Sequence, residues 1–136
     1  VDKALAPLAK RVYPSYEAGR LDKASPDFWA GRVLEEKAPV FRGLDRGIFS
    51  IYLFNILHLT EGQGIFQGAG VPHAYLEGRN IELMSNSDNV LRGGLTPKHV
   101  DVPELLKHVR FEATHPVIMD GEGQGAARWY QSAMAV

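Results

Sequence analysis

The sequence predicts a mainly β domain with a helical lead-in. Apolar residues recur at helical intervals up to about residue 46, whereas strand-forming residues dominate from Gly47 onward. Short apolar stretches then alternate with glycine-containing turns, a spacing typical of a small β-sandwich or barrel. Three segments are therefore expected: helices in residues 1–46, barrel strands in residues 47–100, and a short helix with the start of a further β element in residues 101–136.

The composition indicates one soluble globular domain. The chain has 136 residues, of which 45% are hydrophobic and 23% charged, enough for a single core. Its net charge of −1, with Lys and Arg spread along the chain, argues against nucleic acid as a partner. No apolar run approaches the roughly 18 residues of a membrane span. Because cysteine is absent, disulfides and thiolate metal sites are excluded. The absence is compatible with the cytoplasm, the location we expect, but does not by itself establish it.

The first helix is predicted from small and aliphatic residues that lie three or four positions apart. Pro14 is expected to stop this helix, because proline lacks the backbone N–H of a helix interior. The residues at helical spacing are Ala4, Leu5, Leu8, Ala9 and Val12.

A second helix is expected to begin at Ser25-Pro26-Asp27. Serine can cap a helix, proline suits the first helical position, and aspartate complements the positive end of the helix dipole. Pro39 is expected to end this helix. One face would carry three large apolar side chains, Trp29, Val33 and Leu34.

The residues from Ile48 to Leu59 are rich in Ile, Tyr, Phe and Leu, which favours a strand that is apolar on both faces. Glycine turns separate the shorter strands expected after it: Ile65-Phe66, residues 73–76 and residues 81–84. Beyond them, Asp101 with Glu104 three residues later predicts a capped helix. Residues 110–113 and 117–119 could form further strands.

Residues 67–98 mix imidazole, carboxylate and cationic side chains among strand formers, which suits a polar pocket inside a barrel. His73 is the metal candidate, because imidazole is a good ligand for zinc. On an extended strand Tyr75 would point to the same side as His73. The other histidines form neither an H-x-H nor an H-x₃-H set. His73 is therefore either a metal ligand with partners elsewhere or a hydrogen-bonded barrel histidine.

Two cations and two carboxylates are further candidates. Arg92 has small neighbours and could clamp a phosphate or stabilise an oxyanion, or else it lies on the surface beside a turn. Asp88 and Glu82 could act as acid or base if withdrawn from water, although Asp88 also suits a turn. Lys98 could meet an anionic substrate group, but most lysines are solvated. These residue types alone do not define a reaction.

Two stretches resemble the type I phosphomannose isomerase family: P-H-A-Y-L at residues 72–76 and I-E-L-M-S-N-S-D-N-V-L-R-G-G-L-T-P-K at residues 81–98. The F-N-I-L-H-L-T-E-G-Q-G-I-F and D-V-P-E-L-L stretches that flank them are similar to the same family. The resemblance covers about residues 46–112. The S-D-N-x-x-R-x-G-L-T-P-K run is its most specific part.

The resemblance implies a cupin-like (jelly-roll) β-barrel enzyme with one zinc ion. Such an enzyme interconverts mannose 6-phosphate and fructose 6-phosphate through a zinc-stabilised enediolate. His73 matches the family's late zinc-binding histidine, and Arg92 matches its catalytic arginine. Asp88 is a weaker candidate for proton transfer. The positions that match the lining of the family's sugar-phosphate pocket are Tyr75, Glu82, Asp88 and Lys98.

The chain departs from the family in its other zinc ligands. Members supply a glutamine and a histidine from a Q-x-H motif and then a glutamate, whereas this chain contains no Q-x-H. We therefore expect a barrel that is incomplete in this chain, either as a later part of the catalytic domain or as a form that has lost the earlier half. Two alternatives to the isomerase are a non-catalytic cupin-like module that binds a sugar or anion, and a structural fragment that pairs with another copy.

Overall fold

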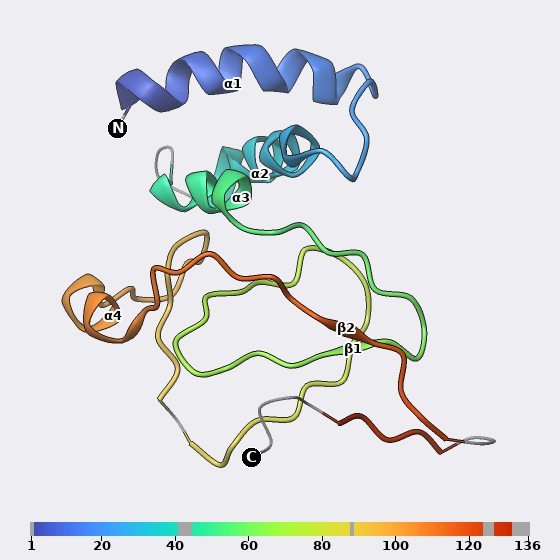
Figure 1. Ribbon diagram of the computed structural model, residues 1–136. Coiled ribbons are helices and arrows are strands. Elements are labelled where there is room, and N and C mark those ends of the chain that lie inside the picture. Colours follow the sequence, from blue (N-terminus) through green and yellow to red (C-terminus); the bar gives the residue numbers. More distant parts are fainter. Residues whose placement is uncertain (1, 41–44, 88, 124–126, 132–136) are drawn as a thin grey trace. The chain divides into compact units, whose positions relative to one another are not determined.

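A computed structural model describes most of the chain, namely residues 2–40, 45–87, 89–123 and 127–131 (Figure 1). The chain divides into two units, which are described separately. Unit 1 comprises Val1–Ile56 with His73–His108, and unit 2 comprises Leu57–Pro72 with Val109–Val136. Among the described residues, no helix is both long enough and apolar enough to cross a membrane.

Unit 1 is built on helices. Two long helices, α1 and α2, pack against each other, and two short ones follow α2 along the chain (Figure 1). A fifth helical element, α4, lies later in the sequence. Their bounds are α1 Asp2–Glu17, α2 Pro26–Val40, the 3₁₀ helix η1 Arg46–Phe49, α3 Ser50–Leu53 and α4 Val102–His108.

The core of unit 1 lies among α1, α2, η1 and α3. Its buried side chains come from all four elements, and partly buried residues surround them, including Leu95 from a loop far along the chain. The helical lead-in predicted from the spacing of apolar residues is therefore present. The buried core residues are Leu5, Val12, Trp29, Ala30, Ile48 and Ile51.

Helix α1 continues through Pro14 to Glu17, so the prediction that Pro14 ends it was wrong. The last turn is stabilised by the contacts that Tyr16 makes with α2. The Tyr16 ring meets Phe28 edge-on at a centroid distance of 5.4 Å, and its hydroxyl donates to Glu35 at 2.9 Å. This tertiary packing outweighs the backbone hydrogen bond that proline removes.

Helix α2 begins at Pro26, as the Ser25-Pro26-Asp27 sequence predicts. The Ser25 hydroxyl accepts a hydrogen bond from the backbone N–H of Asp27 at 3.2 Å. The Asp27 carboxylate accepts two hydrogen bonds from Arg11 on α1, at 2.6 and 2.8 Å, and one from the Tyr52 hydroxyl on α3 at 2.8 Å. One carboxylate therefore links three helices.

The fold-class prediction of a mainly β, cupin-like barrel was wrong. Within the described residues the only sheet is an antiparallel pair of two-residue strands, β1 Gly64–Ile65 and β2 Ile118–Met119, with an isolated bridge between Glu122 and Trp129. The stretch expected as a strand from Ile48 instead begins with η1 and α3. Ile48 and Ile51 lie three positions apart, so a helical turn directs both into the core. A short apolar run does not distinguish a strand from a buried helix.

The strands expected at residues 73–76 and 81–84 are also absent. The described residues of this region lie in neither a helix nor a strand. Strand-forming side chains favour an extended backbone, but a strand forms only where its N–H and C=O groups pair with a neighbour. Ile81 and Leu83 are 93% and 94% exposed, so no neighbouring layer covers them in this structure.

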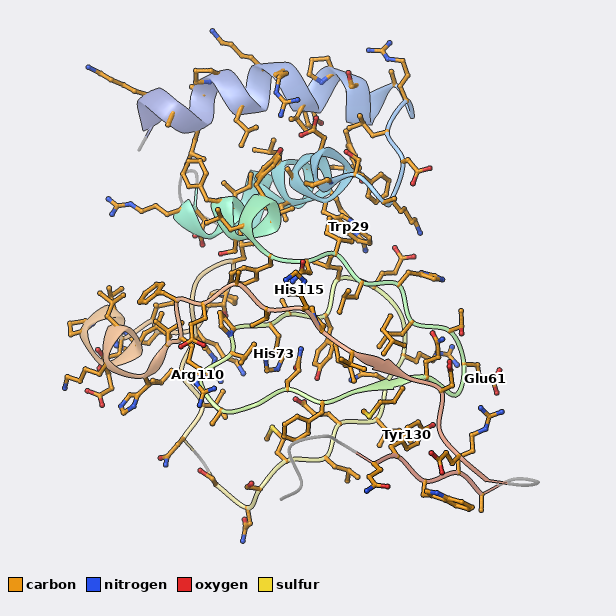
Figure 2. All side chains as sticks on the ribbon, viewed as in Figure 1. Trp29, Glu61, His73, Arg110, His115 and Tyr130 are labelled. Carbon is orange, nitrogen blue, oxygen red and sulfur yellow. The ribbon has the colours of Figure 1, made fainter. Side chains whose placement is uncertain are left out.

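Unit 2 is organised around the short β pair and the ring of Tyr130 (Figure 2). The ring lies against Gly64 and Gly121, where a Cβ atom would come within 3.2 and 2.8 Å of it. The Tyr130 hydroxyl donates to the Gly62 carbonyl at 2.8 Å, and the Gln63 amide donates to Asp120 at 2.8 Å. The strand expected in residues 117–119 is confirmed at Ile118–Met119.

Candidate active site

Three of the predicted site residues lie together in unit 1. His73 Nε2 lies 3.8 Å from a carboxylate oxygen of Glu82. The rings of His73 and Tyr75 meet edge-on, with centroids 6.0 Å apart. These contacts agree with the expectation that residues 73 and 75 point to one side of an extended backbone. We call His73, Tyr75 and Glu82 the histidine cluster.

The environment of the histidine cluster is polar and partly open to water. The side chains of His73 and Glu82 are 38% and 40% exposed. Partial burial raises the pKa of Tyr75, and hydrogen bonding with Glu82 raises this pKa further. A phenol with a raised pKa keeps its proton and can therefore donate a hydrogen bond to a carboxylate or a substrate oxygen.

Glu77, between Tyr75 and Glu82 in the sequence, is bound to α2 and to the turn before it. Glu77 accepts hydrogen bonds from Lys23 and from Arg32, the latter at 2.7 Å. The Arg32 guanidinium also lies 5.6 Å from the ring of Trp29, whose indole N–H donates to the Lys23 carbonyl at 2.7 Å. The two cations lower the pKa of Glu77, so the carboxylate stays ionised. Figure 2 shows Trp29 on α2 and His73 on the irregular segment of residues 73–91, whose described residues lie in neither a helix nor a strand.

The structure does not join the predicted cations to the histidine cluster. Arg92 is half-buried and Lys98 is exposed, with the Lys98 backbone N–H donating to the Thr96 hydroxyl at 3.2 Å. Among the described residues, neither side chain makes a hydrogen bond or ion pair to the cluster. Asp88 lies outside the described residues. The roles assigned to Arg92, Asp88 and Lys98 therefore stay predictions.

The described residues do not supply a complete zinc site. They contain no group of three or more His, Asp or Glu side chains placed to hold a metal ion. His73 with Glu82 offers one imidazole and one carboxylate, whereas a catalytic zinc normally has three protein ligands. Zinc therefore stays a prediction.

Sequence reasoning missed Asp45, which connects two distant parts of unit 1. Its carboxylate accepts hydrogen bonds from the backbone N–H groups of Gly47 at 2.7 Å and Leu95 at 2.9 Å. The first bond has a local signal, because aspartate two residues before a glycine suits a helix cap. The second spans 50 residues and has no signal in the sequence.

Comparison with known proteins shows that parts of the chain are similar to curated isomerases from bacteria, a fungus and mammals. All three relatives described here are mannose-6-phosphate isomerases. The Escherichia coli protein is 55% identical over 69 residues, which cover 51% of this chain and 18% of the relative. The Cryptococcus neoformans protein is 37% identical over 113 residues, or 83% of this chain and 25% of the relative. The Bos taurus protein is 49% identical over 104 residues, or 76% of this chain and 23% of the relative.

These similarities confirm the resemblance to phosphomannose isomerases that the motifs at residues 72–98 predict. The chain spans between 18% and 25% of the length of these three relatives. No protein-family model matches the chain, and no solved structure matches it significantly.

Proposed function

We propose that the protein carrying this sequence is a mannose-6-phosphate isomerase, which interconverts mannose 6-phosphate and fructose 6-phosphate. The observation that supports the proposal most strongly is the similarity, at 37–55% identity, to proteins of that name from bacteria, a fungus and a mammal. The convergence of His73, Tyr75 and Glu82 adds support, because these residues lie in the motifs that carry the resemblance.

The reaction moves a carbonyl between C1 and C2 of the sugar. A base takes the proton from C2 of the aldose, an enediolate forms, and the proton returns to C1, while the hydroxyl proton of O2 passes to O1. Carboxylates suit this transfer, and we assign it to Glu82 or Asp88. Arg92 stabilises the negative charge that develops on the oxygens. Lys98 and Tyr75 bind the sugar phosphate, through charge and through the phenol hydroxyl respectively.

We assign His73 as one ligand of a zinc ion. Its neutral imidazole is a suitable donor, and the carboxylate of Glu82 at 3.8 Å can orient the ring. A His73→Ala variant of the full protein is expected to contain much less zinc than the wild type when purified and measured by atomic absorption. Equal zinc content in the two proteins would remove His73 from the ligand set.

An isomerase assay with mannose 6-phosphate tests the proposal directly. Arg92→Ala is expected to lower kcat by about 10²–10³-fold with a smaller change in KM, because the lost interaction acts mainly in the transition state. Arg79→Ala is the matched control, since Arg79 is an exposed arginine of the same unit that no step of the proposed reaction uses. An inactive wild-type protein would refute the proposed function. An unchanged kcat in Arg92→Ala would remove only Arg92 from it.

A further inference from the structure

Asp45 links the loop of residues 92–96, here called the Arg92 loop, to the start of η1 through hydrogen bonds. One carboxylate oxygen accepts the backbone N–H of Gly47 at the start of η1, at 2.7 Å. The other accepts the backbone N–H of Leu95, at 2.9 Å. A partly buried carboxylate with both oxygens engaged holds its partners more firmly than a neutral hydrogen bond does. Asp45 therefore fixes the distance between η1 and the Arg92 loop.

The two backbones approach so closely that side chains are excluded on both sides. A Cβ atom on Gly94 would lie 3.0 Å from the Cα of Gly47, and one on Gly47 would lie 2.9 Å from the backbone nitrogen of Leu95. Gly94 also has a φ of 126°, which L-residues with side chains rarely adopt. The close approach of the two backbones therefore requires glycine at positions 47 and 94.

Leu95 adopts a backbone conformation that is unfavourable for this residue type. Its φ is 51°, a left-handed conformation that is unfavourable for a residue with a branched side chain. Such a conformation persists only where its surroundings enforce it. The Leu95 side chain packs against the core of unit 1, and its N–H is bound by Asp45. The core and the carboxylate together hold the residue in place.

We propose that Asp45 is a positioning residue for Arg92 in the isomerisation, an inference that rests on the function proposed above. Arg92 is half-buried and lies three residues before Leu95, separated from it by Gly93-Gly94. Two consecutive glycines cannot by themselves define where an arginine points. A guanidinium that stabilises a developing oxyanion must be held within hydrogen-bond distance of it. Asp45 supplies the fixed point from which the loop places Arg92.

The test compares Asp45→Ala and Asp45→Asn with a matched control in the full protein. Asparagine keeps the shape of the side chain but only one accepting oxygen, so it can serve only one of the two N–H groups. The control is Asp101→Ala, which removes another capping aspartate of unit 1, one that accepts the Glu104 N–H at 3.0 Å. All variants are assayed with mannose 6-phosphate. Circular dichroism measures folding, and hydrogen exchange measures protection of the Leu95 amide.

We expect Asp45→Ala to lower kcat by about 10–100-fold while KM changes much less, because misplacing a catalytic group by about 1 Å costs this much. Asp45→Asn should fall between wild type and Asp45→Ala, and Asp101→Ala should keep the wild-type kcat. The Leu95 amide should exchange faster in both Asp45 variants. Combining Asp45→Ala with Arg92→Ala should cost little more than Arg92→Ala alone, because both changes remove the same interaction.

Three results would overturn the inference while leaving the isomerase function intact. The first is a wild-type kcat in Asp45→Ala, and the second is an unchanged exchange rate of the Leu95 amide. The third is a double variant in which the two losses multiply, which would show that Asp45 acts independently of Arg92. If Asp45→Ala does not fold, Asp45→Asn carries the same comparisons. A wild-type protein without isomerase activity would instead refute the proposed function, and the inference with it.

Discussion

The helices α1–α3 and the irregular segment of residues 73–91 belong to the same unit but are held in different ways. The helices bury side chains almost completely, with Leu5 and Val12 only 1% exposed. The segment leaves most of its apolar side chains in water, with Leu83 94% exposed. Glu77 of this segment makes polar contacts with Arg32 on α2 and with Lys23 in the turn before α2.

This difference shows where stability and candidate function reside in unit 1. Burial of apolar surface stabilises the helices, whereas exposed ion pairs of the kind made by Glu77 contribute little and are weakened by salt. The histidine cluster lies on the weakly held segment. We therefore expect changes in the helices to alter global stability, and changes in the segment to alter local order.

The largest effect is expected from Leu5→Ala in the core. Removing a buried leucine side chain should lower the free energy of unfolding by about 2–5 kcal/mol, since both apolar burial and packing are lost. Leu83→Ala, which removes the same atoms from a side chain that is 94% exposed, should change it by less than about 0.5 kcal/mol. Chemical denaturation measures both. Equal effects would show that the segment is as firmly packed as the helices.

Gly31→Ala tests how closely α1 and α2 approach. A Cβ atom at Gly31 would lie 2.5 Å from the Cβ of Tyr16, which cannot move without shifting α1. We expect a loss of about 1–3 kcal/mol from overpacking. In an exposed helix the same change would instead stabilise the protein by roughly 1 kcal/mol. A stabilised variant in thermal denaturation would therefore contradict the close contact.

Tyr52→Phe gives a smaller effect with a distinctive pH dependence. Losing the hydrogen bond from the Tyr52 hydroxyl to Asp27 should cost about 1 kcal/mol at neutral pH. In the wild type, burial and then the hydrogen bond to Asp27 raise the pKa of Tyr52 from 10.0 to about 12.

The folded state therefore retains the Tyr52 proton over a range in which the unfolded chain releases it. This contribution is complete below pH 10 and is lost as the pH rises towards 12. The difference in unfolding free energy between wild type and Tyr52→Phe should shrink over that range. A difference that stays constant from pH 9 to about pH 12 would contradict the raised pKa.

Glu77→Gln should have the smallest effect on global stability. The substitution removes the negative charge that binds both Lys23 and Arg32, so the backbone amides of residues 75–79 should exchange faster with solvent. The midpoint of thermal unfolding should change little, because exposed ion pairs contribute little to stability. Glu61→Gln, at an exposed turn in unit 2, is the matched control. If exchange in the segment is unaffected, the ion pairs do not order it.

Features encoded by neighbouring residues were predictable from the sequence. The start of α2 follows from Ser25-Pro26-Asp27, and the start of α4 follows from Asp101, which accepts the Glu104 N–H at 3.0 Å. The proximity of His73 and Tyr75 follows from the two-residue repeat of an extended backbone. In each case the interacting residues lie within a few positions of each other, so the local sequence is enough to predict the contact.

Features that depend on distant partners were not predictable. The stretch after Ile48 has a composition that suits a strand, but its place beside α2 made a helical turn more favourable. Residues 73–84 have the right composition for strands but are not paired with another strand in a sheet. The bond between Asp45 and Leu95 links positions 50 residues apart, and no pattern in a single sequence encodes it.

The placement of the two tryptophans gives each unit its own fluorescent reporter. Trp29 is 7% exposed within unit 1, whereas Trp129 is 59% exposed within unit 2. Emission from a shielded indole shifts to longer wavelength when water reaches it, and emission from an indole already in water shifts little. Replacing Trp129 by phenylalanine would leave a spectrum that reports the melting of the helices alone, without an added dye.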